Sequence, residues 1–135
     1  MDIIGIGTDI VECVRIGRMV ERHGEMFLTR VYTPREISYC QARKNATEHF
    51  SGRWAAKEAI LKCLGTGWSK GINWTDLEVR NDFNGAPHVH IGGAARERAQ
   101  QLHIGGFLLS ISHCRAYATA TVIAVGNGNL PPISD

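Results

Sequence analysis

The chain has 135 residues, which is long enough for one domain with a core of its own. With 44% hydrophobic and 21% charged residues it has an ordinary globular composition, which argues against disorder. The formal net charge of +2 is too small to indicate nucleic-acid binding by itself.

The cysteines and the N-terminus bear on the compartment. Cys13, Cys40, Cys63 and Cys114 have no C-x-x-C spacing, so we interpret them as reduced, structural thiols and expect no zinc site. The first residues lack both the positively charged start and the long apolar run of a secretion signal. No segment approaches the ~20 apolar residues that a membrane span needs. We therefore expect a cytoplasmic protein that does not bind membranes.

The first predicted element is a buried strand from Ile3 to Val11, in which Gly5 and Gly7 allow another backbone to approach closely. Asp9 lies in the inner part of this strand. A carboxylate is costly to bury there unless it is paired or binds a metal. Asp9 is therefore a candidate metal ligand, although a turn or a helix N-cap would explain it about as well.

Residues 14–23 have the pattern of a short amphipathic helix. Arg15, Arg18 and Arg22 follow one another at helical spacing and form a basic stripe. Most such stripes are solvated faces. The alternative is a docking surface for an acidic partner, where exposed charges act mainly through encounter rate and orientation.

Two further helices are predicted. Thr33-Pro34-Arg35-Glu36 has the residues of a capping box with proline at the first helical position, and this helix should reach about residue 42. The longest helix should start with a second capping box, formed by Asn45 and Glu48, and end at Gly65. Gly52 inside it indicates a close contact. Its apolar residues fall on more than one side, so we expect both faces to be covered.

The remainder predicts mostly strands. Residues 76–80 and 88–91 flank the turn signal Asn84-Gly85, residues 94–102 form a helix, and residues 107–113 and 117–125 form two more strands. We place one domain at residues 1–125 and a loosely ordered tail at residues 126–135.

Several candidate site residues lie on the longest helix or after it. Glu58 and Lys62, at i and i+4, should meet on one helix face, and Gly65, Thr66 and Gly67 come directly after it. Ser110, Ser112 and His113 end a later strand. With Asp9, the two carboxylates suit Mg²⁺, the lysine suits a phosphate, and the glycine turn offers backbone N–H groups. Each feature also has a plain structural explanation: a surface ion pair, a helix C-cap and a satisfied core histidine.

The order and spacing of three segments resemble a known family. These segments are Gly5-Ile6-Gly7-Thr8-Asp9-Ile10-Val11-Glu12, the stretch from Phe50 to Gly67, and Ser110-Ile111-Ser112-His113. They are similar to the holo-[acyl-carrier-protein] synthases, which are small bacterial 4′-phosphopantetheinyl transferases. The resemblance runs from residue 2 to about residue 125.

The resemblance implies an α+β fold, with a long helix packed on an antiparallel sheet. It implies transfer of 4′-phosphopantetheine from coenzyme A to a serine of apo acyl carrier protein in fatty acid biosynthesis, with release of adenosine 3′,5′-bisphosphate. It makes Asp9 and Glu58 the Mg²⁺ ligands and Lys62 a pyrophosphate contact, while Glu58 or a metal-bound water takes the serine proton. The residues that it places at coenzyme A are Arg53, Lys62, Gly65, Thr66, Gly67, Pro87, Ser110, Ser112 and His113.

The resemblance also implies partners. The carrier protein is acidic and would dock on Arg15, Arg18, Met19, Arg22 and Met26. Glu25 and Met26 depart from the basic residue and phenylalanine that relatives often have, so carrier affinity or partner preference should differ. A homotrimer with the coenzyme A cleft between neighbouring subunits is implied as well.

Two other functions remain open on the residues alone. A non-catalytic module that recognises acidic helices would use the same arginine stripe. A small nucleic-acid binder would too, although the modest charge and the lack of a nucleic-acid motif argue against it.

Overall fold

The computed structural model describes residues 2–133 and has an α+β fold, as predicted. Its elements are β1 (Ile3–Glu12), α1 (Cys13–His23), α2 (Glu25–Val31), α3 (Pro34–Gln41), α4 (Ala46–Leu64), the 3-10 turn η1 (Trp74–Asp76), β2 (Leu77–Asn81), β3 (Pro87–Ile91), α5 (Gly93–Gln101), β4 (Gly106–His113) and β5 (Tyr117–Val125). None of the helices described between residues 2 and 133 is both long and apolar enough to span a membrane.

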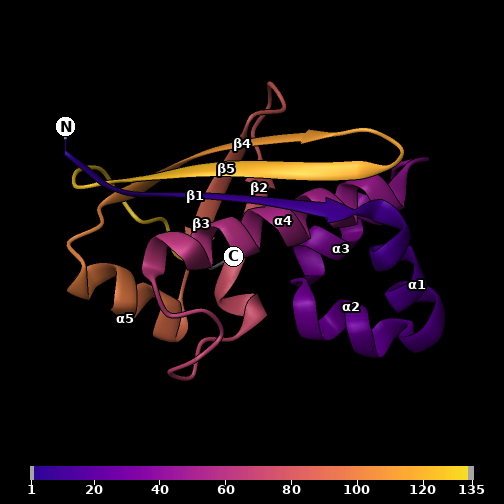
Figure 1. The fold of residues 1–135 in the computed structure, drawn as a ribbon, viewed down its shortest axis with the longest axis horizontal. Helices are drawn as coiled ribbons and strands as arrows, with labels where there is room; N and C mark the ends of the chain where they lie inside the picture. Colours follow the sequence, from indigo (N-terminus) through magenta and orange to yellow (C-terminus); the bar gives the residue numbers. More distant parts are fainter. Residues whose placement is uncertain (1, 134–135) are drawn as a thin grey trace.

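Two antiparallel sheets carry the strands. The larger has the order β1-β5-β4, and β2 pairs with β3 in a separate ribbon. Helix α4 runs along one face of the larger sheet, with α1, α2 and α3 near one end and α5 near the other (Figure 1). The opposite face of the sheet exposes large apolar side chains, among them Ile6, Ile10 and Leu108.

Glycines set the distance between β1 and α4. A Cβ on Gly7 would lie 2.0 Å from the carbonyl oxygen of Ala59, so no other residue fits at this crossing. A Cβ on Gly52 would lie 2.9 Å from a methyl group of Ile111 on β4. The close contacts predicted for Gly7 and Gly52 are therefore confirmed, whereas at Gly5 the nearest atom would be 3.6 Å from a Cβ, which is an ordinary contact.

Helix α4 is covered on both sides, as its mixed pattern predicted. Ala55, Ala56 and Ala59 are fully buried, and Leu61 on the other side is only 2% exposed. Gly65 ends the helix in the left-handed conformation, with φ of 72°. A helix this deeply buried holds its side chains in fixed directions.

A buried ion pair fixes the orientation of α4. The Lys57 ammonium group donates to Glu36 Oε1 at 2.7 Å, to the Val31 carbonyl oxygen at 2.6 Å and to the Trp74 carbonyl oxygen at 3.1 Å. Both charged side chains are fully buried. Glu36 also completes the predicted capping box with Thr33 and accepts from the backbone N–H of Val79. This network joins α3, α4, η1 and β2.

Some expectations need correction. The second predicted capping box does not form, because Asn45 caps α4 without a side-chain hydrogen bond and Glu48 pairs with His113 instead. Helix α2 was not predicted at all; the apolar spacing of Phe27, Leu28 and Val31 was its signal in the sequence.

The segment after β5 makes specific contacts. The Leu130 carbonyl oxygen accepts from the Arg96 guanidinium at 2.6 Å, and the Pro131 carbonyl oxygen accepts from the backbone N–H of Ile91 at 3.0 Å. The expected loose order concerns residues 126–135, of which 134 and 135 lie outside the described residues. The domain boundary at residue 125 stays a prediction.

Candidate active site

The first part of the site lies where β1 crosses α4. Asp9 sits in the middle of β1 and does not cap a helix, since Glu12 occupies the N-cap position of α1. The Lys62 ammonium group donates to the Thr8 carbonyl oxygen at 2.6 Å and lies 3.4 Å from Asp9 Oδ1. The lysine is thus held over β1 with half of its side chain still exposed.

Glu58 and Lys62 share a helix face, yet in the described part of the chain the lysine pairs with Asp9 rather than with Glu58. The plain structural alternative, a surface ion pair between Glu58 and Lys62, is therefore wrong. The Lys62 ammonium group reaches β1 instead, because the strand offers it both a carbonyl oxygen and a carboxylate. Glu58 Oε1 instead accepts from the indole N–H of Trp68 at 3.3 Å.

The glycine turn follows directly. Gly65 and Gly67 have φ of 72° and 57°, and among residues 2–133 no heavy atom beyond their immediate chain neighbours lies within 4 Å of where their Cβ atoms would be. The backbone is open here to a ligand. Trp68 comes next in the chain and returns toward α4 at Glu58.

A second cluster lines a pocket of ≈200 Å³. It collects three of the predicted coenzyme A residues, Arg53, Pro87 and His113. Arg53 is 3% exposed, donates to Asn81 Oδ1 at 2.6 Å and lies 4.2 Å from the Tyr39 ring centroid. Within residues 2–133 its Nε has no hydrogen-bond partner. A buried guanidinium with an unsatisfied donor favours an anion in this pocket.

His113 is on the rim of this pocket and is not a core histidine. Its Nδ1 lies 2.9 Å from Glu48 Oε1, and its ring meets the edge of the His49 ring at a centroid distance of 4.9 Å. The hydrogen bond from His113 lowers the pKa of Glu48. Burial, followed by the charge of His113, lowers the pKa of His49.

Strand alternation divides the segment from Ser110 to His113. Ile111 and His113 face the pocket, whereas Ser110 and Ser112 are exposed on β4, at the alternating positions.

The Asp9 part of the site and the His113 part also lie apart. Asp9 belongs to one edge strand and His113 to the other, with β5 between them, which separates the edge strands by about 10 Å.

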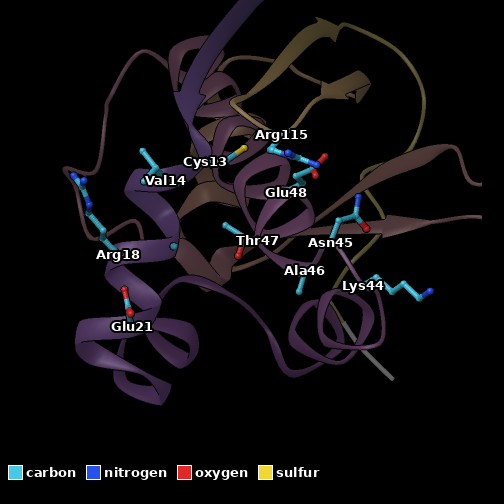
Figure 2. Close-up of a pocket in the computed structure, with 11 residues that line it drawn as sticks. Cys13, Val14, Arg18, Glu21, Lys44, Asn45, Ala46, Thr47, Glu48 and Arg115 are labelled. Carbon is cyan, nitrogen blue, oxygen red and sulfur yellow. The ribbon is translucent and has the colours of Figure 1, made fainter.

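The predicted docking residues border two different hollows. Met19 and Met26 line one of ≈220 Å³ together with His23, Phe27 and Arg30. Arg18 borders another of ≈540 Å³ at the start of α4, with Lys44 and Arg115 on its rim (Figure 2). Arg15 lies 5.8 Å from the Trp54 ring centroid. The larger hollow includes Glu48, ten residues and about 15 Å along α4 from Glu58, so it is separate from the candidate metal ligands.

Pattern reasoning missed several residues of these clusters. Tyr39, His49 and Asn81 line the Arg53 pocket, and Trp68 contacts Glu58. Only Trp68 had a signal, since it directly follows the glycine turn. The others come from separate elements, which no local pattern connects.

The sequence and the fold of this chain are similar to those of known proteins. The sequence profile of the 4′-phosphopantetheinyl transferase superfamily matches residues 5–122. The chain belongs to this superfamily. The holo-[acyl-carrier-protein] synthase of Rhodopirellula baltica is 42% identical over 123 residues, which cover 91% of this chain and 98% of the relative.

Solved structures agree with this assignment. The holo-[acyl-carrier-protein] synthase of Neisseria meningitidis has a TM-score of 0.83 at 31% identity, covering 92% of this chain and 99% of that one. The Helicobacter pylori synthase, solved in complex with coenzyme A, has a TM-score of 0.79 at 30% identity, covering 90% and 100%. The resemblance seen in the sequence is confirmed. The chain is a phosphopantetheinyl transferase of the holo-[acyl-carrier-protein] synthase family.

Proposed function

We propose that this transferase takes 4′-phosphopantetheine from coenzyme A, passes it to a serine of apo acyl carrier protein, and releases adenosine 3′,5′-bisphosphate. The observation that carries the proposal is the Lys62 ammonium group held over Asp9, on the same helix face as Glu58 and next to the open glycine turn. The Helicobacter pylori relative, in complex with coenzyme A, supports the choice of donor.

Asp9 and Glu58 fit Mg²⁺, which commonly takes one or two carboxylates and completes its shell with waters and substrate phosphates. Among residues 2–133, no three His, Cys, Asp or Glu side chains gather as a ready-made cage. This donor set therefore suits an ion that arrives with the pyrophosphate. When bound, the ion supplies charge neutralisation at the phosphates.

The reaction forms a bond between the serine Oγ and the β-phosphorus of coenzyme A and breaks the bond from that phosphorus to the bridging oxygen. The leaving adenosine 3′,5′-bisphosphate keeps the electron pair. Lys62 stabilises the departing charge, and the N–H groups of the glycine turn orient the pyrophosphate. The serine proton passes to Glu58 or to a water molecule.

We infer a homotrimer with the cleft between subunits. In one chain, Asp9, Glu58 and Lys62 lie toward one edge of the sheet and Arg53, Pro87 and His113 toward the other. A neighbouring copy can supply the second cluster to the first. Ile6, Ile10, Leu108 and Tyr117, which are 47–67% exposed on the outer face of the sheet, support burial against other copies.

The basic residues of α1 suit an acidic carrier, with Met19 and Met26 offering an apolar hollow beside them. We place the reaction in the cytoplasm and in fatty acid biosynthesis; assays with carriers of fatty acid and of polyketide synthesis distinguish the two pathways.

The deciding experiment incubates the enzyme with apo acyl carrier protein, coenzyme A and Mg²⁺, followed by mass spectrometry of the carrier. A pantetheine adduct that depends on Mg²⁺ supports the proposal. Glu58→Gln should reduce turnover at least a hundredfold without loss of fold. No adduct with several carriers, or carrier binding that is insensitive to Asp9→Asn and to Mg²⁺, would favour a non-catalytic binding module.

The trimer has a test of its own. Ile10→Glu places a charge on the outer face of the sheet and should give a monomer in sedimentation, with loss of coenzyme A binding. A wild-type protein that sediments as a fully active monomer would contradict the shared cleft.

A further inference from the structure

Three tryptophans form a continuous stack beside the candidate metal ligand. The ring centroids of Trp54 and Trp74 are 4.3 Å apart, and those of Trp74 and Trp68 are 3.8 Å apart. These are all three tryptophans of the chain, and they come from α4, η1 and the loop between them. The stack spans segments that the sequence separates by up to twenty residues.

The tryptophan stack contacts α4 at both of its ends, at Trp54 and, through Trp68, at Glu58. Trp54 lies one helical turn before Glu58, so both side chains are on the same face of α4. The indole N–H of Trp68 donates to Glu58 Oε1 at 3.3 Å. The contacts thus run from α4 through Trp54, Trp74 and Trp68 back to α4 at Glu58.

Trp74 and the loop that carries Trp68 are each held in place by further interactions. The Trp74 carbonyl oxygen accepts from the fully buried Lys57 ammonium group at 3.1 Å. On the other side, the left-handed residues Gly65 and Gly67 turn the loop sharply after α4. The Trp68 indole is therefore packed on Trp74 in a position from which its N–H reaches the Glu58 carboxylate.

We propose that Trp68 is a positioning residue for Glu58. Its N–H holds Oε1 in one orientation and leaves Oε2 for the metal ion or the serine proton. This inference rests on the proposed function, in which Glu58 is a metal ligand. Hydrogen bonds from neighbouring groups to ligating carboxylates orient them, and losing one costs about 10–100-fold in metal affinity or activity.

The test separates the N–H group from the ring. Trp68→Phe keeps an aromatic ring on Trp74 but cannot donate, whereas Trp68→Ala loses both. Ser69→Ala is the matched control, because it removes a hydrogen bond to Thr66 inside the same loop without touching Glu58. Each variant is assayed for kcat, for KM of coenzyme A and for melting temperature.

Mn²⁺ binding is measured for the same variants by electron paramagnetic resonance, with coenzyme A and without carrier. We expect Trp68→Phe to weaken Mn²⁺ binding and to lower kcat by about tenfold or more, with KM and melting temperature close to wild type. Ser69→Ala should resemble wild type. If Trp68→Phe also resembles wild type in metal binding and kcat, the ring only packs and the proposal is wrong.

A spectroscopic measurement tests the hydrogen bond between Trp68 and Glu58 independently of activity. In ¹⁵N-labelled protein, the Trp68 indole N–H resonance should shift in Glu58→Gln, more than the Trp54 and Trp74 indole resonances do. A Trp68 indole resonance that is unchanged in Glu58→Gln overturns the proposal. If the contact is present but no carrier is modified, the proposed function fails and the positioning contact stands.

Discussion

The Lys57 ammonium group lies 2.7 Å from Glu36 in a fully buried ion pair, while Glu58, the next residue along α4, accepts a hydrogen bond from Trp68 at the candidate site. Lys62, five residues after Lys57, has 54% of its side chain exposed and lies over Asp9. One helix thus carries a buried lysine that joins it to α3 and an exposed lysine to which we assign a role in the proposed reaction.

Lys57→Met should strongly destabilise the protein. Removing one partner of a buried pair leaves the Glu36 charge uncompensated, which typically costs about 3–5 kcal/mol. Urea unfolding measures the loss. A change below about 1 kcal/mol would show that the pair does not hold α3 against α4.

Lys62→Met should have the opposite profile. An exposed ion pair contributes at most about 1 kcal/mol to stability, so unfolding should change little. If Lys62 stabilises the leaving group, kcat/KM in the carrier assay should fall about 10²–10³-fold. Retention of full activity would remove Lys62 from the mechanism.

Gly7→Ala should separate β1 from α4. The added methyl group would lie 2.0 Å from the Ala59 carbonyl oxygen, and we expect a loss of about 3 kcal/mol or more in unfolding free energy. Gly5→Ala is the matched control, because its methyl group would lie 3.6 Å from the nearest atom, in ordinary contact. That variant should stay within about 0.5 kcal/mol of wild type.

Stability should fall as the pH is lowered through the ordinary histidine pKa of 6.5, in part because of His49. Burial and then the charges of His113, Arg53 and Arg43 lower its folded-state pKa, against the opposing effect of Glu48. The unfolded chain therefore binds a proton that the folded chain resists, which favours unfolding at lower pH.

His49→Phe should flatten this pH dependence between pH 7.5 and 5.5 in urea unfolding. The two proteins are also compared at pH 8, where His49 is neutral in both states and any difference reflects packing. An unchanged slope in the variant would show that His49 does not contribute.

Glu25→Lys should strengthen carrier docking, since the native carboxylate opposes an acidic partner beside Met26. One exposed charge pair is worth about 0.2–1 kcal/mol, so KM for the carrier should fall up to about fivefold at low salt. The gain should disappear at high salt. Equal KM values at low salt would place the carrier elsewhere on the surface.

Local patterns predicted most of the elements because their signals are local. The Thr33–Glu36 capping box and the Gly65 stop each depend on residues within one turn, and both are present. Helix α2 was missed because seven residues give too short a periodic signal. The pairing of Glu48 was also missed, since its partner His113 is 65 residues away.

By itself the sequence determined the fold class, the family and the residue types at the site, because these depend on spacing and order along the chain. Only the tertiary structure decided which side chains meet. In the folded chain Lys62 pairs with Asp9 rather than with Glu58, and Glu58 accepts a hydrogen bond from Trp68. Arg53 and His113 lie toward the other edge of the sheet. The reason is physical: a long side chain takes the partner that helix–strand packing brings within reach, and that packing depends on contacts between distant segments.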